Sequence, residues 1–202
     1  MWKQLNYWDE HGNLIPHLTR EQSEQRLAFI YTPKDSCVLE LGARYGTVSC
    51  ATNIILSNPK NHVVVEPDST VWSALEYNKE INNCTFHIVK GFCSNKKLSL
   101  TGRGYCTRTI PDLQSNHPSF TLSELQSLVD KPFDTLIADC EGFLETFLDE
   151  NPNLYDSLST LIFEKDRPDV CDYTKIKLTL SSKGFEPVVE GFREVWKKSI
   201  TE

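Results

Sequence analysis

The stretch CVLELGARYGTVS, residues 37–49, joins a short apolar run to a loop that contains two glycines. The run 38–41 predicts a buried β-strand, and 47–56 predicts the helix that follows it. Gly42 and Gly46 lie in the turn between that strand and that helix. This order of elements is typical of folds that hold a nucleotide-like cofactor beyond the carboxyl end of a sheet.

The rest of the chain alternates strands with helices. Further strands are predicted at 62–66, 85–89, 133–138, 160–163, 185–189 and 193–197, and further helices at 20–31, 68–82, 121–129, 141–150 and 173–183. The alternation predicts an α/β fold: a doubly wound, Rossmann-like, mostly parallel seven-stranded sheet with helices on both faces. Only Glu190-Gly191 separates the last two strands, so the last strand is expected to run antiparallel.

The chain is expected to form one domain over 1–202, with a helical lead-in over about 1–33. Thr19 and Gln22 form a predicted capping box for the first helix, and Thr121 and Glu124 form another. Gly184 lies where a helix should end. Residues 91–120 contain no clear helix, and a long structureless stretch in a compact domain is usually a functional loop.

Composition limits the classes of partner. The 202 residues carry a net charge of −7, which disfavours nucleic acid, since proteins that neutralise many phosphates are usually basic. No apolar run approaches the length needed to span a bilayer. Seven scattered cysteines without a CxxC pair, in a chain that begins without a signal-like segment, predict reduced thiols and a cytoplasmic protein.

Four acids are expected at or just past strand ends: Glu40, Glu66, Asp139 and Glu164. The carboxyl ends of parallel strands meet at one edge of a sheet, where ligands bind. An acid can also end a strand simply because solvent begins there. Four such acids on the ligand side favour a binding site.

The glycine loop distinguishes between cofactors. A dinucleotide fingerprint needs a middle glycine for the pyrophosphate, and Ala43 and Arg44 leave no such glycine here. Glu40 would repel a pyrophosphate but attract the ammonium and sulfonium of S-adenosylmethionine (SAM). Glu66, 26 residues after Glu40, is suited to accept hydrogen bonds from both ribose hydroxyls. SAM is therefore the expected cofactor.

These motifs resemble the class I SAM-dependent methyltransferases and, more narrowly, the FkbM family of O-methyltransferases. The resemblance spans about residues 20–197 and rests on Gly42-Ala43, Gly46, Glu66-Pro67, Asn78, Thr121-Leu122-Ser123, Asp139-Cys140-Glu141-Gly142 and Glu164. It departs from the family at Ile137, where a lysine is common, and at Tyr45, where an asparagine is common. The resemblance implies a methyltransferase that modifies a hydroxyl of a sugar or glycan.

The expected site follows from these motifs. The cofactor-binding set is Glu40, Gly42, Ala43, Gly46, Glu66, Pro67, Gly91, Phe92 and Asp139, and the catalytic set is Asp139, Glu141 and Glu164. Asp139 is the leading general base for the hydroxyl. Glu141 is expected to open the next helix, where an acid is favourable even without a chemical role.

A metal is an alternative that the carboxylates leave open. Asp139, Glu164 and Asp166 offer three hard ligands to Mg²⁺ or Mn²⁺, unless Glu164 pairs instead with Lys165 or Arg167. In the 91–120 loop, a substrate groove could draw on Arg103, Tyr105, Arg108 and His117.

Other functions stay open at this point. The acceptor could be another small molecule or a protein, and the chain could be a non-catalytic SAM-binding module of a larger protein. A nicotinamide dehydrogenase ranks third, because the middle glycine is missing.

Overall fold

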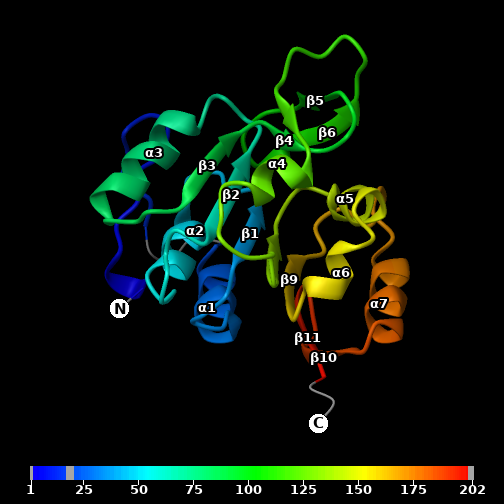
Figure 1. The fold of residues 1–202 in the computed structure, drawn as a ribbon. Coiled ribbons are helices and arrows are strands. Elements are labelled where there is room, and N and C mark those ends of the chain that lie inside the picture. Colours follow the sequence, from blue (N-terminus) through cyan, green and yellow to red (C-terminus); the bar gives the residue numbers. More distant parts are fainter. Residues whose placement is uncertain (1, 17–20, 200–202) are drawn as a thin grey trace.

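A seven-stranded sheet forms the centre of the structure, a computed structural model that describes residues 2–16 and 21–199 (Figure 1). The strand order is β10-β11-β9-β8-β1-β2-β3. The strands are β1 Val38–Leu41, β2 His62–Glu66, β3 His87–Lys90, β8 Thr135–Ala138, β9 Thr160–Glu164, β10 Phe185–Val189 and β11 Arg193–Lys198. The predicted fold class is confirmed.

Strand direction follows the expectation from the short final connection. β1 pairs in parallel with β2 and β8, and β3 and β9 extend the parallel sheet on either side. β11 is inserted between β9 and β10 and runs antiparallel to both. The antiparallel last strand is therefore confirmed, and its insertion places Arg193 opposite Glu164.

Helices cover both faces of the sheet (Figure 1). On one face, apolar residues of three helices pack against strand residues such as Val38 and Val64. On the other face, four helices pack against Leu39 and Leu161. The first group is α1 Gln22–Tyr31, α2 Thr47–Asn53 and α3 Trp72–Ile81, and the second is α4 Leu122–Gln126, α5 Leu144–Glu150, α6 Leu154–Ser157 and α7 Tyr173–Ser182. A short 3-10 helix, η1, spans Trp2–Gln4.

Burial on both faces explains the continuous apolar runs of the central strands. Every residue of β1, β2 and β8 is buried. A parallel sheet covered on both sides requires such runs instead of an apolar-polar alternation. The described residues include no helix that is both long enough and apolar enough to cross a membrane.

Two of the predicted helix ends are found. The Thr121 hydroxyl accepts from the Glu124 N–H at 3.2 Å, and Glu124 Oε2 accepts from the Thr121 N–H at 2.7 Å, which completes the capping box. Gly184 follows α7 with φ of 80°. The capping box predicted at Thr19 and Gln22 involves Thr19, which lies outside the described residues.

Two predicted helix starts are wrong. The helix expected from Asp68 begins at Trp72, because the Asp68 carboxylate accepts from the Thr70 N–H at 2.9 Å and forms a turn first. The helix expected from Glu141 begins at Leu144. Glu141 and Gly142 have φ of 51° and 86°, in the left-handed region that a right-handed helix excludes.

The segment 91–120 has no α-helix, as expected, but it is not structureless. β4 Phe92–Cys93 pairs with β7 Ser119–Phe120, and β5 Leu98–Thr101 forms a hairpin with β6 Arg108–Pro111. The 3-10 helix η2, Gly104–Cys106, lies in the hairpin connection. Figure 1 shows the hairpin projecting beyond one end of the main sheet. The hairpin supplies one wall of the cavity described next.

Candidate active site

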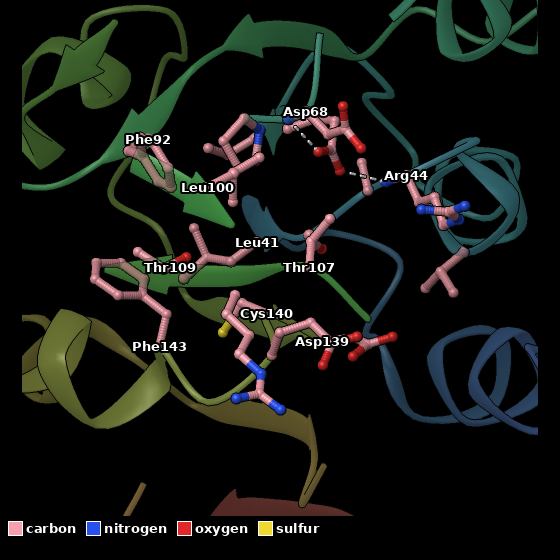
Figure 2. Close-up of a pocket in the computed structure, with 18 of the residues that line it drawn as sticks. Leu41, Arg44, Asp68, Phe92, Leu100, Thr107, Thr109, Asp139, Cys140 and Phe143 are labelled. Atoms are coloured by element: carbon pink, nitrogen blue, oxygen red, sulfur yellow. Dashed lines mark hydrogen bonds between the residues drawn. The ribbon is translucent and has the colours of Figure 1, made fainter. Parts of the chain in front are cut away.

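A cavity opens at the carboxyl edge of β1, β2 and β8 (Figure 2). Its empty space, with the open mouth included, is about 870 Å³. Figure 2 shows Phe92, Thr109 and Phe143 toward one end and Arg44 toward the other. Of the residues in the predicted cofactor-binding and catalytic sets, seven line the cavity: Gly42, Ala43, Glu66, Pro67, Phe92, Asp139 and Glu141.

The glycine loop lies directly against the turn that follows β8. The N–H groups of Gly42 and Ala43 donate to the Val65 carbonyl at 3.0 and 3.3 Å, and the Asp139 N–H donates to the Leu41 carbonyl at 3.0 Å. Gly42 has φ of 85°, and a Cβ at this position would collide with the Asp139 carbonyl oxygen. The loop therefore needs glycine for both its conformation and its contact.

Glu66 presents a carboxylate that the backbone holds in place. Its Oε2 accepts from the Arg44 N–H at 2.6 Å and its Oε1 from the Asp68 N–H at 2.7 Å, the dashed lines in Figure 2. Each carboxylate oxygen accepts two hydrogen bonds, so both retain capacity toward the cavity. Burial raises the pKa of Glu66 to about 7, against the lowering effect of the two backbone bonds.

Glu40 lies beneath the glycine loop instead of on the wall of the main cavity. The Ser49 hydroxyl donates to its Oε1 at 2.7 Å, and His62 Nε2 lies 3.1 Å from its Oε2. All three side chains are at most 2% exposed. The carboxylate that was expected to attract a cationic cofactor is thus bound inside the protein.

Gly46 and Gly91 also lie outside the cavity wall and shape the backbone around it. Gly46, with φ of 76°, precedes α2, and a Cβ there would lie 2.6 Å from the Leu75 side chain. The Gly91 N–H donates to the Glu66 carbonyl at 3.0 Å, and a Cβ at Gly91 would collide with the Pro118 carbonyl. Both glycines allow close packing of neighbouring segments.

Asp139 and Glu141 are both acids with a raised pKa. Burial raises the pKa of Asp139 well above its ordinary value, and the charges of Glu164 and Asp166 add to this shift. Burial followed by the charge of Asp166 raises the pKa of Glu141 to about 7. Carboxyls with raised pKa values are better proton acceptors when ionised, which suits general-base chemistry.

Asp139 belongs to a cluster with Glu24 and Glu164, in which one carboxylate oxygen of each residue lies within 4.8 Å of those of the other two. Arg193 Nε lies 2.6 Å from Glu24 Oε1, and Arg193 Nη2 lies 2.5 Å from Glu164 Oε2. Asp166, expected with Asp139 and Glu164 in a metal site, is not part of this cluster, but its charge still acts on Asp139. Its Oδ1 accepts a hydrogen bond from the Tyr173 hydroxyl at 2.7 Å.

This cluster does not fit a divalent cation. The Arg193 guanidinium already bridges two of the three carboxylates. The guanidinium offsets the negative charge of these two carboxylates and occupies oxygens that a dication would need as ligands. Glu164 pairs with neither Lys165 nor Arg167, because Lys165 is 2.7 Å from Glu194 and Arg167 is 2.5 Å from Asp169.

The β5–β6 hairpin contributes Leu100, Thr107, Arg108 and Thr109 to the cavity wall. Of the other loop residues suggested for a groove, Arg103 and His117 do not line the cavity. The His117 ring packs edge-on against Phe92 at 5.8 Å between centroids. The side chain of Tyr105 lies outside the described part of the chain.

An N-terminal segment supports the glycine loop from the opposite side. The Tyr7 hydroxyl donates to the Thr47 carbonyl at 3.0 Å, and the Tyr45 hydroxyl donates to Glu10. Asn78 Nδ2 donates at 2.9 Å to the carbonyls of both Trp8 and Tyr45. Tyr45, where the resembled family commonly has asparagine, therefore anchors this segment to the loop.

Sequence reasoning missed several wall residues, including Glu24, Thr107, Thr109 and Phe143. Glu24 follows Glu21 by one helical turn, and both line the cavity, so the spacing of acids on the first helix was an available signal. The alternation in LSLT and RTI was a signal for the hairpin. Local sequence gave no signal that Arg193 reaches Glu24.

The chain matches no protein-family model and no curated protein sequence. Solved structures do share its fold. A precorrin-6y C5,15-methyltransferase from Geobacter metallireducens is 13% identical, with 92% of each chain covered and a TM-score of 0.57. An O-methyltransferase from Bacillus cereus in complex with SAH is 14% identical, with 91% of this chain and 84% of that chain covered and a TM-score of 0.56.

A protein from Pyrococcus horikoshii assigned as an RNA methyltransferase is 14% identical, with 91% and 87% covered and a TM-score of 0.52. At these identities the likeness shows the fold alone. The chain has the Rossmann-like fold of class I SAM-dependent methyltransferases. The neighbours' names differ in acceptor, so the fold does not specify the acceptor of this chain.

Proposed function

We propose that this protein is a SAM-dependent O-methyltransferase. The observation that carries the proposal is the joint placement of Glu66 and Asp139 on one cavity beside the glycine loop. Glu66 is a carboxylate held by two backbone N–H groups, as recognition of a diol requires. Asp139 is a buried acid with a raised pKa, and its ionised form is therefore the stronger acceptor for a hydroxyl proton.

In this proposal Glu66 would hold the ribose hydroxyls of SAM, and Pro67 and Phe92 would form the surface for its adenine. Gly42 and Ala43 would border its methionine part, where the absence of a side chain at residue 42 allows close approach. Glu40, Gly46 and Gly91 act indirectly, through the shape of the loop and the strand ends.

SAM bound here would supply a sulfonium methyl for in-line displacement by the acceptor oxygen, with SAH as the leaving group. Asp139 would take up the proton of the acceptor hydroxyl. Alignment of nucleophile, carbon and sulfur supplies several kcal/mol of such a barrier. Glu141, at the cavity wall with a pKa of about 7, is a second acid near the acceptor.

For the acceptor we propose a sugar or glycan hydroxyl. The resemblance of Asp139-Cys140-Glu141-Gly142 to the FkbM motif supports this choice. The hydroxyls of Thr107 and Thr109 and the guanidinium of Arg108 on the hairpin wall also support it, because they can hydrogen-bond polyols.

Calorimetry with SAM, SAH and NAD tests the cofactor, and a mass-detected screen of sugars, glycans, catechols, peptides and RNA tests the acceptor. We expect SAM and SAH to bind with micromolar affinity, about −8 kcal/mol, and NAD to give no heat. Binding of NAD alone would refute the proposal. Methylation of RNA or peptide but not of sugars would support the proposed methyltransferase activity and refute the proposed sugar or glycan acceptor.

A further inference from the structure

We propose that Arg193 takes the place of a divalent cation in the acidic cluster, so that the site works without metal. In this role Arg193 is a positioning residue, which holds Glu24 and Glu164 while Asp139 faces the acceptor. The metal-binding part of the proposal stands on the structure alone. The part that concerns turnover rests on the proposed function.

Strand register delivers the guanidinium to the cluster. Arg193 is the first residue of β11, and its Cα pairs with that of Glu164 across the antiparallel ladder. Its Nε reaches Glu24 on α1, which is 169 residues away in sequence. One side chain thus joins three elements: the end of β9, the start of β11 and helix α1.

The guanidinium is enclosed where it meets the carboxylates. The side chains of Arg193, Glu24 and Glu164 are 21%, 10% and 12% exposed. The guanidinium carbon lies 5.4 Å from the centroid of the Phe192 ring, which covers it further. A guanidinium stays charged at every working pH and offers donors in a fixed planar fork, so it serves as a permanent cation with defined geometry.

Arg193 forms salt bridges with Glu24 and Glu164 but none with Asp139, the third carboxylate of the cluster. Asp139 and Glu24 border both the main cavity and a smaller recess, whereas Glu164 and Arg193 border only the recess. The cation therefore lies behind the carboxylates as seen from the main cavity. A metal ion at this place would need the oxygens that Arg193 already binds.

The direct test is a titration of the full chain with Mn²⁺. Binding is monitored by calorimetry and by the electron paramagnetic resonance signal of free Mn²⁺. The unaltered protein should bind no Mn²⁺ at this cluster up to about 1 mM, the weak end of protein sites for hard cations. Arg193→Met keeps an apolar stem and removes the charge, so the freed carboxylates should bind Mn²⁺ at least about tenfold more tightly.

Two controls identify the site. Arg193→Lys keeps the charge and should still exclude Mn²⁺. Arg193→Met combined with Glu164→Gln should lose the Mn²⁺ binding that Arg193→Met gains. Binding of Mn²⁺ by the unaltered protein that Glu164→Gln abolishes would overturn the proposal. This last comparison needs no Arg193 variant, so it decides the question even where Arg193→Met fails to fold.

Turnover provides a second readout. With an identified acceptor, excess chelator should leave kcat unchanged, and Arg193→Lys should lower kcat with the SAM dissociation constant retained, because an ammonium lacks the planar fork. Mn²⁺ should raise the activity of Arg193→Met and not that of the unaltered protein. Loss of activity in chelator would overturn the proposal. Absence of SAM binding would refute the proposed function and leave the Mn²⁺ titration as the test of Arg193.

Discussion

The carbonyl oxygen of Asp139 occupies the space that a side chain at Gly42 would need. The loop after β1 and the turn after β8 therefore touch through their backbones, with the Asp139 N–H bonded to the Leu41 carbonyl at 3.0 Å. In the proposed function, these two segments hold the cofactor and the general base. Their backbone contact brings the two segments close together.

This contact predicts that Gly42→Ala is far more damaging than an ordinary glycine substitution. Gly184 is a matched control, because its φ of 80° is close to the 85° of Gly42 and a Cβ there would meet no atom within 4 Å. Gly184→Ala should lose only about 1–2 kcal/mol for the left-handed conformation. Gly42→Ala should lose more than about 4 kcal/mol, since it must also displace backbone. Urea unfolding measures both, and equal losses would contradict the contact.

The parts of the fold that local sequence encodes were predictable. The β-branched run before Glu66 specifies β2, and this places Glu66 at the carboxyl edge of the sheet. Gly42 and its strand likewise follow from one short stretch of sequence. These elements depend on neighbours in the chain, so their position was recoverable from pattern alone.

The surroundings of Asp139 were not predictable in the same way. Arg193 reaches Glu24 and Glu164 because β11 is inserted between β9 and β10, and a register between distant strands leaves no local signal. The turn at Glu141 was also missed. The φ of Glu141, 51°, is uncommon for a residue with a side chain. An acid followed by an apolar run is instead typical of a helix start, so the pattern predicted a helix here.

Glu40 provides a prediction that separates stability from cofactor binding. Glu40→Ala should remove the partner of Ser49 and His62, which are both 0% exposed. Each buried polar group left without its partner costs about 1–3 kcal/mol. The free energy of unfolding should therefore fall, while SAM affinity of the folded protein stays close to that of the parent. If Glu40→Ala kept the stability of the parent but lost SAM affinity, Glu40 would instead be a cofactor-binding residue.

Glu66 should make SAM binding pH-dependent. Its pKa is raised to about 7 by burial, so in the free protein it is mostly protonated below that pH and ionised above it. The ribose hydroxyls donate to the carboxylate, so binding favours the ionised form. SAM affinity should therefore rise from pH 6 to pH 8, by at most about tenfold per pH unit for one proton.

The matched variant for this dependence is Glu66→Gln, which keeps the shape and removes the titrating group. It should bind SAM more weakly, by about 1.5–3 kcal/mol for each hydrogen bond lost to a charged acceptor, and its affinity should be flat over the same pH range. Calorimetry of both proteins at several pH values provides the comparison. A pH profile that survives in Glu66→Gln would assign the titration to another group.

Asp139→Asn tests the proposed general base. The amide is nearly isosteric with the carboxylate but does not take up a proton from the acceptor hydroxyl. SAM binding should change little, because Glu66 and the glycine loop carry most of that recognition in the proposed function. Turnover should fall by about 10²–10⁴, the usual contribution of a positioned general base.

Glu141→Gln is the control on the same turn and should cost much less, because Glu141 lies outside the cluster of Asp139, Glu24 and Glu164. Both variants are compared with a fixed acceptor, saturating SAM and mass detection of product. Near-parental turnover in Asp139→Asn, together with a large loss in Glu141→Gln, would move the base from Asp139 to Glu141, whose pKa of about 7 also suits it.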